Sequence, residues 1–254
     1  MNVVLWQVEI SHYSEKVRWA LDFKSIGHTR RTPLPGLHGL YALALTAGRQ
    51  RRLPVLAIDG RRIGDSTAII AELETQSPEP PLYPLDPSDR VRALALEDYF
   101  DLQLAPPLRR YLWHHTLPDV DATIEALMPH AGPGRVRFIR AIGPVARPLV
   151  RRDYQITQTT AARALGEIRA AMDRVEQELQ PSGYLVGESF TVADLTAAAL
   201  FTPVLAPPQR PYAPRSLAPA LLESREELAS RTGGMWVAEM YARHRGPPAA
   251  LVRR

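Results

Sequence analysis

Two short segments of the sequence place hydroxyl and carboxyl side chains where a helix is expected to begin. Ser11 precedes a stretch with apolar residues at helical spacing, and Asp65-Ser66 precede another. The first N–H groups of a helix have no partner within the helix, so this end attracts negative charge, and a serine hydroxyl there can donate to a bound anion. Serine is also a common helix cap. Position alone favours capping for Ser11 and its neighbour Ser14, with anion binding as the alternative.

Cysteine is absent from the 254 residues. This excludes disulfides, thiolate metal sites and any chemistry on a protein thiol, so a sulfur nucleophile would have to arrive with a ligand. The pair His114-His115 is expected to be solvated rather than to bind metal, because no paired acids or further spaced histidines accompany it.

The formal net charge of +4 does not indicate a nucleic-acid partner. Basic residues alternate with acidic ones, and no dense basic stripe is interleaved with aromatic side chains. The N-terminal segment lacks the pattern of a signal peptide, and no apolar run approaches the roughly 20 residues that span a bilayer. We therefore expect a cytoplasmic protein without a membrane segment.

Residues 1–76 predict the order strand, helix, strand, helix, strand, strand, helix. Val3–Trp6 is a short apolar run typical of a buried strand, and a second strand is expected near residues 28–32. Asp59-Gly60 is a strong hairpin signal between strands at 54–58 and 61–63. A short helix near 40–46 and a helix over 67–73 complete this unit.

The chain beyond this unit reads as helical. Five prolines make the segment that follows a linker: Pro78, Pro80, Pro81, Pro84 and Pro87. Ser88 is expected to cap a helix over 89–104, which Pro106 and Pro107 interrupt before a second helical stretch around 111–113. Residues 118–152 allow only short helices because Pro129, Pro133, Pro144 and Pro148 interrupt them. Three further helices are expected, over 160–180, from 191 onward and over 235–243, with an irregular loop at 203–219.

Four local patterns occur in an order and spacing that resemble the cytosolic glutathione S-transferase superfamily, in particular its serine-type members. They are Ser11-His12-Tyr13-Ser14-Glu15-Lys16-Val17-Arg18, Arg52-Leu53-Pro54-Val55-Leu56, Gly64-Asp65-Ser66-Thr67-Ala68-Ile69-Ile70 and Phe190-Thr191-Val192-Ala193-Asp194-Leu195. In the last pattern, Thr191 and Asp194 form a capping box, which we interpret as structural.

The resemblance implies an α/β thioredoxin-like domain at 1–77, a linker at 78–88 and an all-α helical-bundle domain at 89–254. It also implies glutathione as co-substrate and a homodimer that pairs the first domain of one chain with the second domain of the other. The implied activity is attack of the glutathione thiol on a small hydrophobic electrophile. A non-catalytic binding or regulatory protein with this fold, or a glutathione-dependent isomerase, are the alternatives. Thiol exchange is disfavoured because the chain has no cysteine.

The resemblance assigns Ser11 as the donor that stabilises the glutathione thiolate, with Ser14 and Tyr13 as runners-up. Trp6 stands near the position of the catalytic tyrosine in tyrosine-type members, which argues against that subtype.

The same resemblance implies a glutathione-binding set in the first domain. Pro54 is expected to be cis, which would expose the backbone of Leu53 to the cysteinyl part of glutathione. Arg52 would reach the glycyl carboxylate. Ser66 would hold the glutamyl carboxylate, and Asp65, or an acid from the partner subunit, its ammonium group.

The second substrate is expected between the two domains, where the candidates are Tyr99, Tyr111, Trp113 and His114. Two departures from the family leave this part open. Thr46-Ala47-Gly48 replaces the usual asparagine and proline before the third strand, and the second domain has insertions near 118–152 and 203–219.

Overall fold

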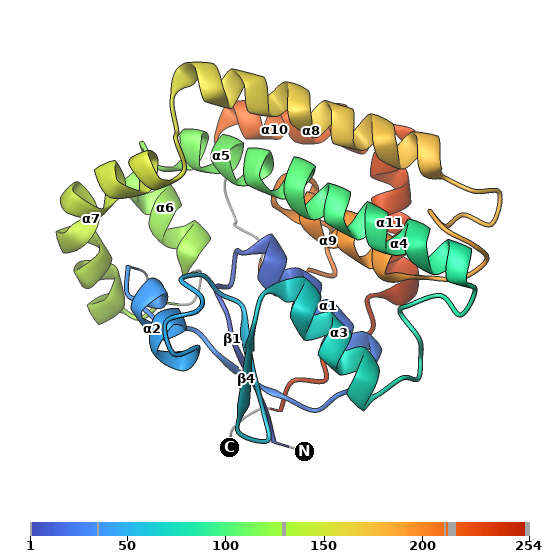
Figure 1. Ribbon diagram of the computed structural model, residues 1–254. Coiled ribbons are helices and arrows are strands. Elements are labelled where there is room, and N and C mark those ends of the chain that lie inside the picture. The colour runs from blue at the N-terminus through green and yellow to red at the C-terminus, as the bar shows by residue number, and fades with distance from the viewer. Residues whose placement is uncertain (1, 35, 129–130, 211, 213–216, 252–254) are drawn as a thin grey trace.

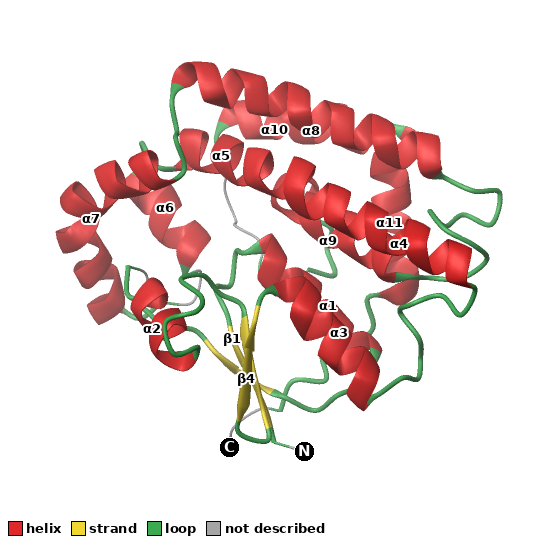
Figure 2. Ribbon diagram, viewed as in Figure 1, coloured by secondary structure: helices red, strands yellow, loops and turns green. Residues whose placement is uncertain are grey.

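The structure is a computed structural model that describes residues 2–34, 36–128, 131–210, 212 and 217–251. Its first part contains a four-stranded sheet in the order β2-β1-β3-β4 (Figures 1 and 2). The strands are β1 (Val3–Trp6), β2 (Thr29–Arg31), β3 (Val55–Ile58) and β4 (Arg61–Gly64). β1 runs parallel to β2 and antiparallel to β3, and β3 runs antiparallel to β4.

Three helices cover this sheet: α1 (His12–Phe23) and α3 (Ser66–Gln76) on one side and α2 (His38–Leu45) on the other (Figure 1). The alternation of side chains along β1 explains both layers. Val3 and Leu5 belong to the main core with α1 and α3, whereas Trp6 packs with a smaller cluster beneath α2. The expected order of elements and the thioredoxin-like fold are confirmed.

The hairpin between β3 and β4 turns at Asp59-Gly60, as the sequence predicted. Asp59 has φ +46° and Gly60 has φ +87°. Two consecutive residues with positive φ match the right-handed twist of the flanking strands, and aspartate and glycine tolerate this region better than other residues.

The second domain begins earlier than the expected helix start at Asp89. Asp86 caps α4 (Pro87–Tyr99) by accepting hydrogen bonds from the N–H groups of Ser88 and Asp89, at 2.8 and 3.0 Å. The sequence analysis wrongly assigned the cap to Ser88. Either residue type can cap a helix, and a cap at the aspartate two residues earlier also allows Pro87 to occupy the first helical position.

The prolines at 106 and 107 do not interrupt the next helix. They stand at the start of α5 (Ala105–Thr116), directly after a turn of π-helix in which the helical hydrogen-bond pattern changes. A π-helical turn, η1 (Phe100–Leu104), joins α4 to α5. The chain from 87 to 116 is consequently one continuous helical rod.

The expectation of only short helices over 118–152 is also wrong. After α6 (Val120–Leu127), α7 (Pro133–Asp153) runs for 21 residues with Pro144 and Pro148 inside it. Figure 1 shows α7 at the edge of the molecule and changing direction along its length. An internal proline removes one helical hydrogen bond and bends the helix, but at a surface water can satisfy the freed carbonyl, so the helix continues.

The remaining helices are α8 (Gln158–Glu178), α9 (Val192–Leu205), α10 (Pro219–Ala229) and α11 (Thr232–His244). The predicted helices at 160–180, from 191 and at 235–243 are confirmed. α10 was not predicted, and residues 211 and 213–216 of the expected loop lie outside the described residues.

α9 forms the centre of the helical domain, because every residue from Val192 to Val204 is buried. The predicted capping box at its start is confirmed. The Thr191 hydroxyl accepts from the Ala193 N–H at 3.2 Å, and the Asp194 carboxylate accepts from the Thr191 N–H at 2.8 Å. No helix within the described ranges is both long enough and apolar enough to cross a membrane.

Candidate ligand cleft between the two domains

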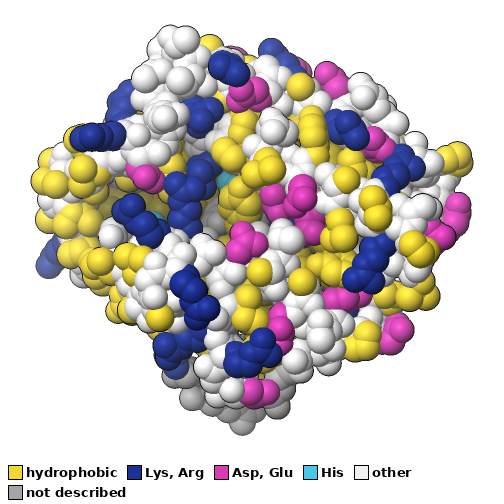
Figure 3. Space-filling view, viewed as in Figure 1, with side chains coloured by type: hydrophobic (Ala, Val, Ile, Leu, Met, Phe, Trp, Pro, Cys, Tyr) yellow, Lys and Arg dark blue, Asp and Glu magenta, His cyan; other side chains and the backbone are white. Residues whose placement is uncertain are grey.

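A cleft of about 460 Å³ lies between the two domains. One wall comes from the starts of α1 and α3 and the loop before β3, and the opposite wall comes from α5, α6 and α7. Figure 3 shows a hollow on this face of the molecule with hydrophobic and basic side chains around it. The cleft brings together all six residues that the sequence analysis selected: Ser11, Arg52, Leu53, Pro54, Asp65 and Ser66.

Ser11 is the cap of α1 and also lines the cleft. Its Oγ accepts a hydrogen bond from the Ser14 N–H at 3.3 Å. This bond uses an acceptor lone pair of the hydroxyl, so the proton on the same oxygen can still be donated to a ligand. Capping and ligand binding are therefore compatible roles for Ser11.

The two runner-up hydroxyls lie in different surroundings. Ser14 is fully buried outside the lining of the cleft, and its Oγ accepts from the Val8 N–H at 3.3 Å. Tyr13 lines the cleft, but its hydroxyl donates to the backbone carbonyl of Asp101 at 2.8 Å. Burial, together with the negative charge of Asp101, raises the pKa of Tyr13, which keeps this phenol protonated.

The peptide bond between Leu53 and Pro54 is cis, as predicted. Upstream of it, the Thr46 hydroxyl donates to the Ala42 carbonyl at 2.7 Å and accepts from the Gln50 N–H at 2.9 Å. These two bonds shape the segment that departs from the family's usual asparagine and proline. A threonine thus supplies the local hydrogen bonds that bring the chain from α2 to Leu53.

Asp65 caps α3 in an unusual backbone conformation, with φ +76°. Its Oδ1 accepts from the N–H groups of Thr67 and Ala68, at 3.0 and 3.1 Å. Non-glycine residues in such conformations cluster at ligand-binding sites, where the surrounding structure holds them. Ser66, the first residue of α3, is buried and lines the cleft beside it.

Asp101 is a site residue that the sequence analysis missed. It belongs to the π-helical turn and lines the cleft. Its Oδ2 accepts from Lys16 Nζ at 2.6 Å and from Thr67 Oγ1 at 2.9 Å. Its Oδ1 is buried without a hydrogen-bond partner in the described part of the chain. A π-helical turn often marks a functional position, but no local sequence pattern predicted one here.

The cation that holds Asp101 is itself fully buried. Lys16 Nζ lies 2.7 Å from Glu97 Oε1 in addition to its contact with Asp101. Burial acts to lower the pKa of Lys16, but the two carboxylates outweigh it and raise that pKa, so the ammonium stays charged. Three segments of the chain, α1, α4 and η1, therefore meet at one ion-paired centre beneath the cleft.

His12 is a further residue of the cleft that was not selected from the sequence. The ring is buried, and Nε2 has no hydrogen-bond partner among the described residues. Burial and the nearby charges of Arg109 and Arg210 lower the pKa of His12 well below its ordinary value. The imidazole is consequently neutral at physiological pH.

The residues on the opposite wall of the cleft differ from those expected to bind the second substrate. Of the four candidates, only Trp113 is among the residues lining the cleft. The Tyr111 hydroxyl instead lies 2.7 Å from Ser224 Oγ inside the helical domain. Four apolar side chains of this wall come from the insertion that was expected to form only short helices: Leu127, Ile139, Ile142 and Val150. The others are Leu112, Trp113 and Leu117, in α5 and directly after it. Apolar residues at helical spacing over 139–150 could have indicated this wall, but the internal prolines argued against a helix there.

Three arginines also line the cleft. The side chain of Arg52 is more than half exposed, and its Nη2 lies 3.7 Å from Asp153 Oδ2. The guanidinium of Arg109 stacks over the ring of Tyr154 at 4.3 Å, and its Nε is buried without a partner in the described structure. Arg147 on α7 is the third.

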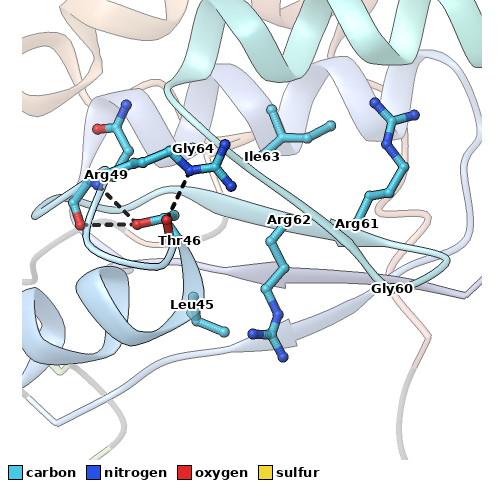
Figure 4. Close-up of a pocket in the computed structure, with 9 residues that line it drawn as sticks. Leu45, Thr46, Arg49, Gly60, Arg61, Arg62, Ile63 and Gly64 are labelled. Atoms are coloured by element: carbon cyan, nitrogen blue, oxygen red, sulfur yellow. Dashed lines mark hydrogen bonds between the residues drawn. The ribbon is translucent and has the colours of Figure 1, made fainter.

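A second hollow, of about 630 Å³, lies near β4 and the end of α2 (Figure 4). Arg49 donates to the Thr46 carbonyl at 3.1 Å, and Arg61 pairs with Glu72 at 2.8 Å. Figure 4 shows Arg61 and Arg62 pointing to opposite sides of the strand. Because these arginines do not converge, this hollow is a weaker candidate. No group of three potential metal ligands occurs in the part of the chain that the structure describes.

Two family models match the chain: the glutathione S-transferase N-terminal domain over residues 5–81 and the C-terminal domain over residues 138–231. None of the curated proteins matches it. Among solved structures, the beta-etherase LigF from Sphingobium sp. strain SYK-6 is similar, with 19% identity and a TM-score of 0.62 over 94% of this chain and 99% of that one.

Two bacterial glutathione S-transferases share the fold as well. The one from Methylobacterium radiotolerans, in complex with glutathione sulfonate, has 20% identity and a TM-score of 0.56 over 92% of this chain and 93% of that one. The one from Rhodospirillum rubrum has 19% identity and a TM-score of 0.58, over 92% and 91%. At these identities the structural similarity concerns the fold.

Proposed function

The chain belongs to the cytosolic glutathione S-transferase superfamily. We propose that it is a glutathione transferase of the cytoplasm, which activates the glutathione thiol for attack on small hydrophobic electrophiles. The observation that carries this proposal is the meeting of two helix starts in one cleft. Ser11 at α1 and Ser66 at α3 both line it, together with the cis peptide at Leu53-Pro54.

In this proposal the first domain holds the peptide part of glutathione. Ser66 binds the glutamyl carboxylate through its hydroxyl and its N–H at the start of α3, since the next two N–H groups are capped by Asp65. The backbone of Leu53 pairs with the cysteinyl unit, and Arg52 binds the glycyl carboxylate. The glutamyl ammonium lies near Asp65 and Asp101, where the unpartnered Oδ1 of Asp101 can accept a hydrogen bond from it.

Ser11 acts on the sulfur. A free thiol with a pKa near 8.5 is only a few per cent ionised at neutral pH. The Ser11 hydroxyl donates a hydrogen bond to the thiolate, and the start of α1 adds the favourable field of its free N–H groups. Both effects lower the thiol pKa, so more of the bound glutathione is nucleophilic. The thiol proton leaves to solvent, the sulfur forms a bond to the electrophilic carbon, and the leaving group on that carbon departs with its bonding electron pair.

Binding of glutathione is the first test. Thermal unfolding with and without glutathione should show a stabilised protein, by about 2.7 kcal/mol when glutathione is present at 100 times its Kd. Ser66→Ala should weaken this effect, whereas Ser88→Ala, at the start of α4 and away from the cleft, should not. A melting temperature unchanged by millimolar glutathione would contradict the proposal. A stabilised protein without turnover of any electrophile would favour the non-catalytic alternative.

We also propose a homodimer, as is typical of the family. An apolar side chain on α4 supports it, because Val91 is 70% exposed and lies outside the lining of the cleft. Such side chains are candidates for burial against a second copy. Light scattering at micromolar concentration should give twice the chain mass, and a monomer mass would contradict this part of the proposal.

A further inference from the structure

Arg109 in α5 carries a charge that the described structure does not neutralise. Its guanidinium stacks on Tyr154, its Nε is buried without a hydrogen-bond partner, and no carboxylate lies within ion-pair distance among the described residues. Burial lowers the pKa of Arg109, with the neighbouring Arg52 adding to the effect. A buried cation without a partner is costly, and a bound anion would remove that cost.

The neighbouring arginines show how unusual this position is. Arg110, the next residue, donates to the Tyr154 carbonyl at 3.2 Å and lies 3.9 Å from Glu167. Arg52 lies 3.7 Å from Asp153. Arg147 on α7 resembles Arg109 instead, because its Nε donates to the carbonyl of Gly143 on its own helix, at 3.4 Å, rather than to a carboxylate. Asp153 is near enough to act on the charge of Arg109, but neither Arg109 nor Arg147 has a carboxylate within ion-pair distance among the described residues.

The acidic residues that line the cleft are already engaged on the opposite wall. Asp101 is held by Lys16, and Asp65 caps α3. The wall that carries Arg109 and Arg147 is otherwise apolar, with Trp113 among its side chains. It therefore combines positive charge with a surface that favours an apolar body.

The shape of this wall suits a flat group. Gly143 and Ala146 of α7 both line the cleft, between larger apolar residues at 142 and 150. A Cβ built on Gly143 would meet only the Arg147 side chain, at 3.9 Å. Small residues between larger ones leave a shallow depression, into which an aromatic ring can pack.

We propose that the electrophile is an aromatic acid: its ring packs against the α5–α7 wall, and its carboxylate binds Arg109 and Arg147. This inference rests on the proposed function, which places the two carboxylates of glutathione at Ser66 and at Arg52. Arg109 and Arg147 then remain for the second substrate. Arginine suits this role because its planar donors match the two oxygens of a carboxylate.

A matched pair of electrophiles can test the charge. In 4-chloro-3,5-dinitrobenzoate, the thiolate sulfur bonds to the ring carbon that carries chlorine, chloride leaves with the electron pair, and the thiol proton has gone to solvent. The corresponding benzamide reacts in the same way but has no charge. The glutathione conjugates of both compounds can be prepared chemically, so their affinities can be measured without turnover.

We expect the native protein to bind the acid conjugate about ten- to a hundredfold more tightly than the amide conjugate, as one or two charge-assisted hydrogen bonds would give. Arg109→Met should bring this ratio close to one, and Arg147→Met should reduce it. Arg110→Met is the matched control, because Arg110 is paired with Glu167 outside the lining of the cleft, and the ratio should be retained. Arg147 is on the peripheral helix, so its variant should fold even if Arg109→Met does not.

The outcomes separate this inference from the proposed function. Equal affinity for both conjugates in the native protein would overturn the inference while glutathione binding stands. If Arg109→Met weakens both conjugates and glutathione alike, Arg109 holds glutathione and the inference is wrong. If glutathione does not bind at all, the proposed function fails. In that case the two free electrophiles, compared directly with the native protein and Arg109→Met, decide whether the wall selects an acid.

Discussion

The two walls of the cleft are built in different ways. The wall of the first domain stands on α1, which is buried along nearly its whole length and tied to α4 and η1 through Lys16. The opposite wall includes α7, in which only Ile139 and Gly143 are buried and Val145 and Leu149 are largely exposed. Local stability follows packing, so the wall proposed to bind glutathione is rigid, whereas the α7 part of the opposite wall, called the yielding wall below, is less stable.

This difference suits a protein that treats two substrates unequally. A rigid wall can position one invariant ligand with little loss of conformational entropy on binding. Substitutions on a peripheral helix with few buried contacts cost little stability. Such substitutions can therefore alter which compound the wall binds. The first-domain wall is rigid because long-range ion pairs hold it, and α7 tolerates change because it has few such pairs. Substitutions on the two walls should therefore differ in their effect on stability.

The largest effect is expected from Lys16→Met. This substitution leaves Glu97 and Asp101 buried without their cation, which should destabilise the fold by about 3–5 kcal/mol. Urea denaturation measures the change, and Arg163→Met, in an exposed pair with Glu167, is the control with an expected loss below about 1 kcal/mol. Similar losses in both variants would mean that the buried centre does not make this wall rigid.

Next in size is the loss of turnover in Ser11→Ala. If the hydroxyl stabilises the thiolate, removing one charge-assisted hydrogen bond should lower the rate about ten- to a hundredfold and raise the pKa of bound glutathione. Thiolate absorbance and turnover measure both. Ser14→Ala should mainly reduce stability, because Ser14 bonds to the Val8 backbone away from the cleft. A thiolate signal lost in Ser14→Ala but kept in Ser11→Ala would reverse the assignment.

A smaller effect should appear as a change of stability with pH. Burial acts to raise the pKa of Glu15, but Arg18 and Arg245 outweigh it, so the pKa is lowered in the folded state. A carboxyl with a lowered folded pKa stabilises the protein above its unfolded pKa, about 4.3, and this contribution is lost as the pH falls further. The stability deficit of Glu15→Gln at pH 7 should therefore shrink below about pH 4. A deficit that is constant with pH would show that the charge of Glu15 does not stabilise α1.

The smallest effect is expected on α7. Leu149 is 62% exposed, so Leu149→Ala should change the free energy of unfolding by no more than about 0.5 kcal/mol. Leu21→Ala in α1 is the matched comparison, and it should cost about 2–5 kcal/mol because Leu21 is fully buried. If both variants lose the same stability by urea denaturation, the two walls do not differ in packing as described.

Several features of both domains were predictable because their signals are local. The Asp59-Gly60 turn and the capping box at Thr191 each depend on a few adjacent residues. In the rigid wall, the cis bond before Pro54 was expected from the family resemblance. The yielding wall was not predictable in the same way. Pro144 and Pro148 argued against a long helix, and only its position at the surface, where water and a bend accommodate them, allows α7 to continue.

By itself the sequence determined the order of elements, the family resemblance and the residues at the two helix starts, since hydrophobic periodicity, turns and caps act over a few residues. Only the tertiary structure decided that Asp101 meets Lys16, 85 positions away, and that Arg109 lies in the cleft without a carboxylate partner among the described residues. Whether a charge is paired depends on which distant segments pack against it, and that information is distributed over the whole chain.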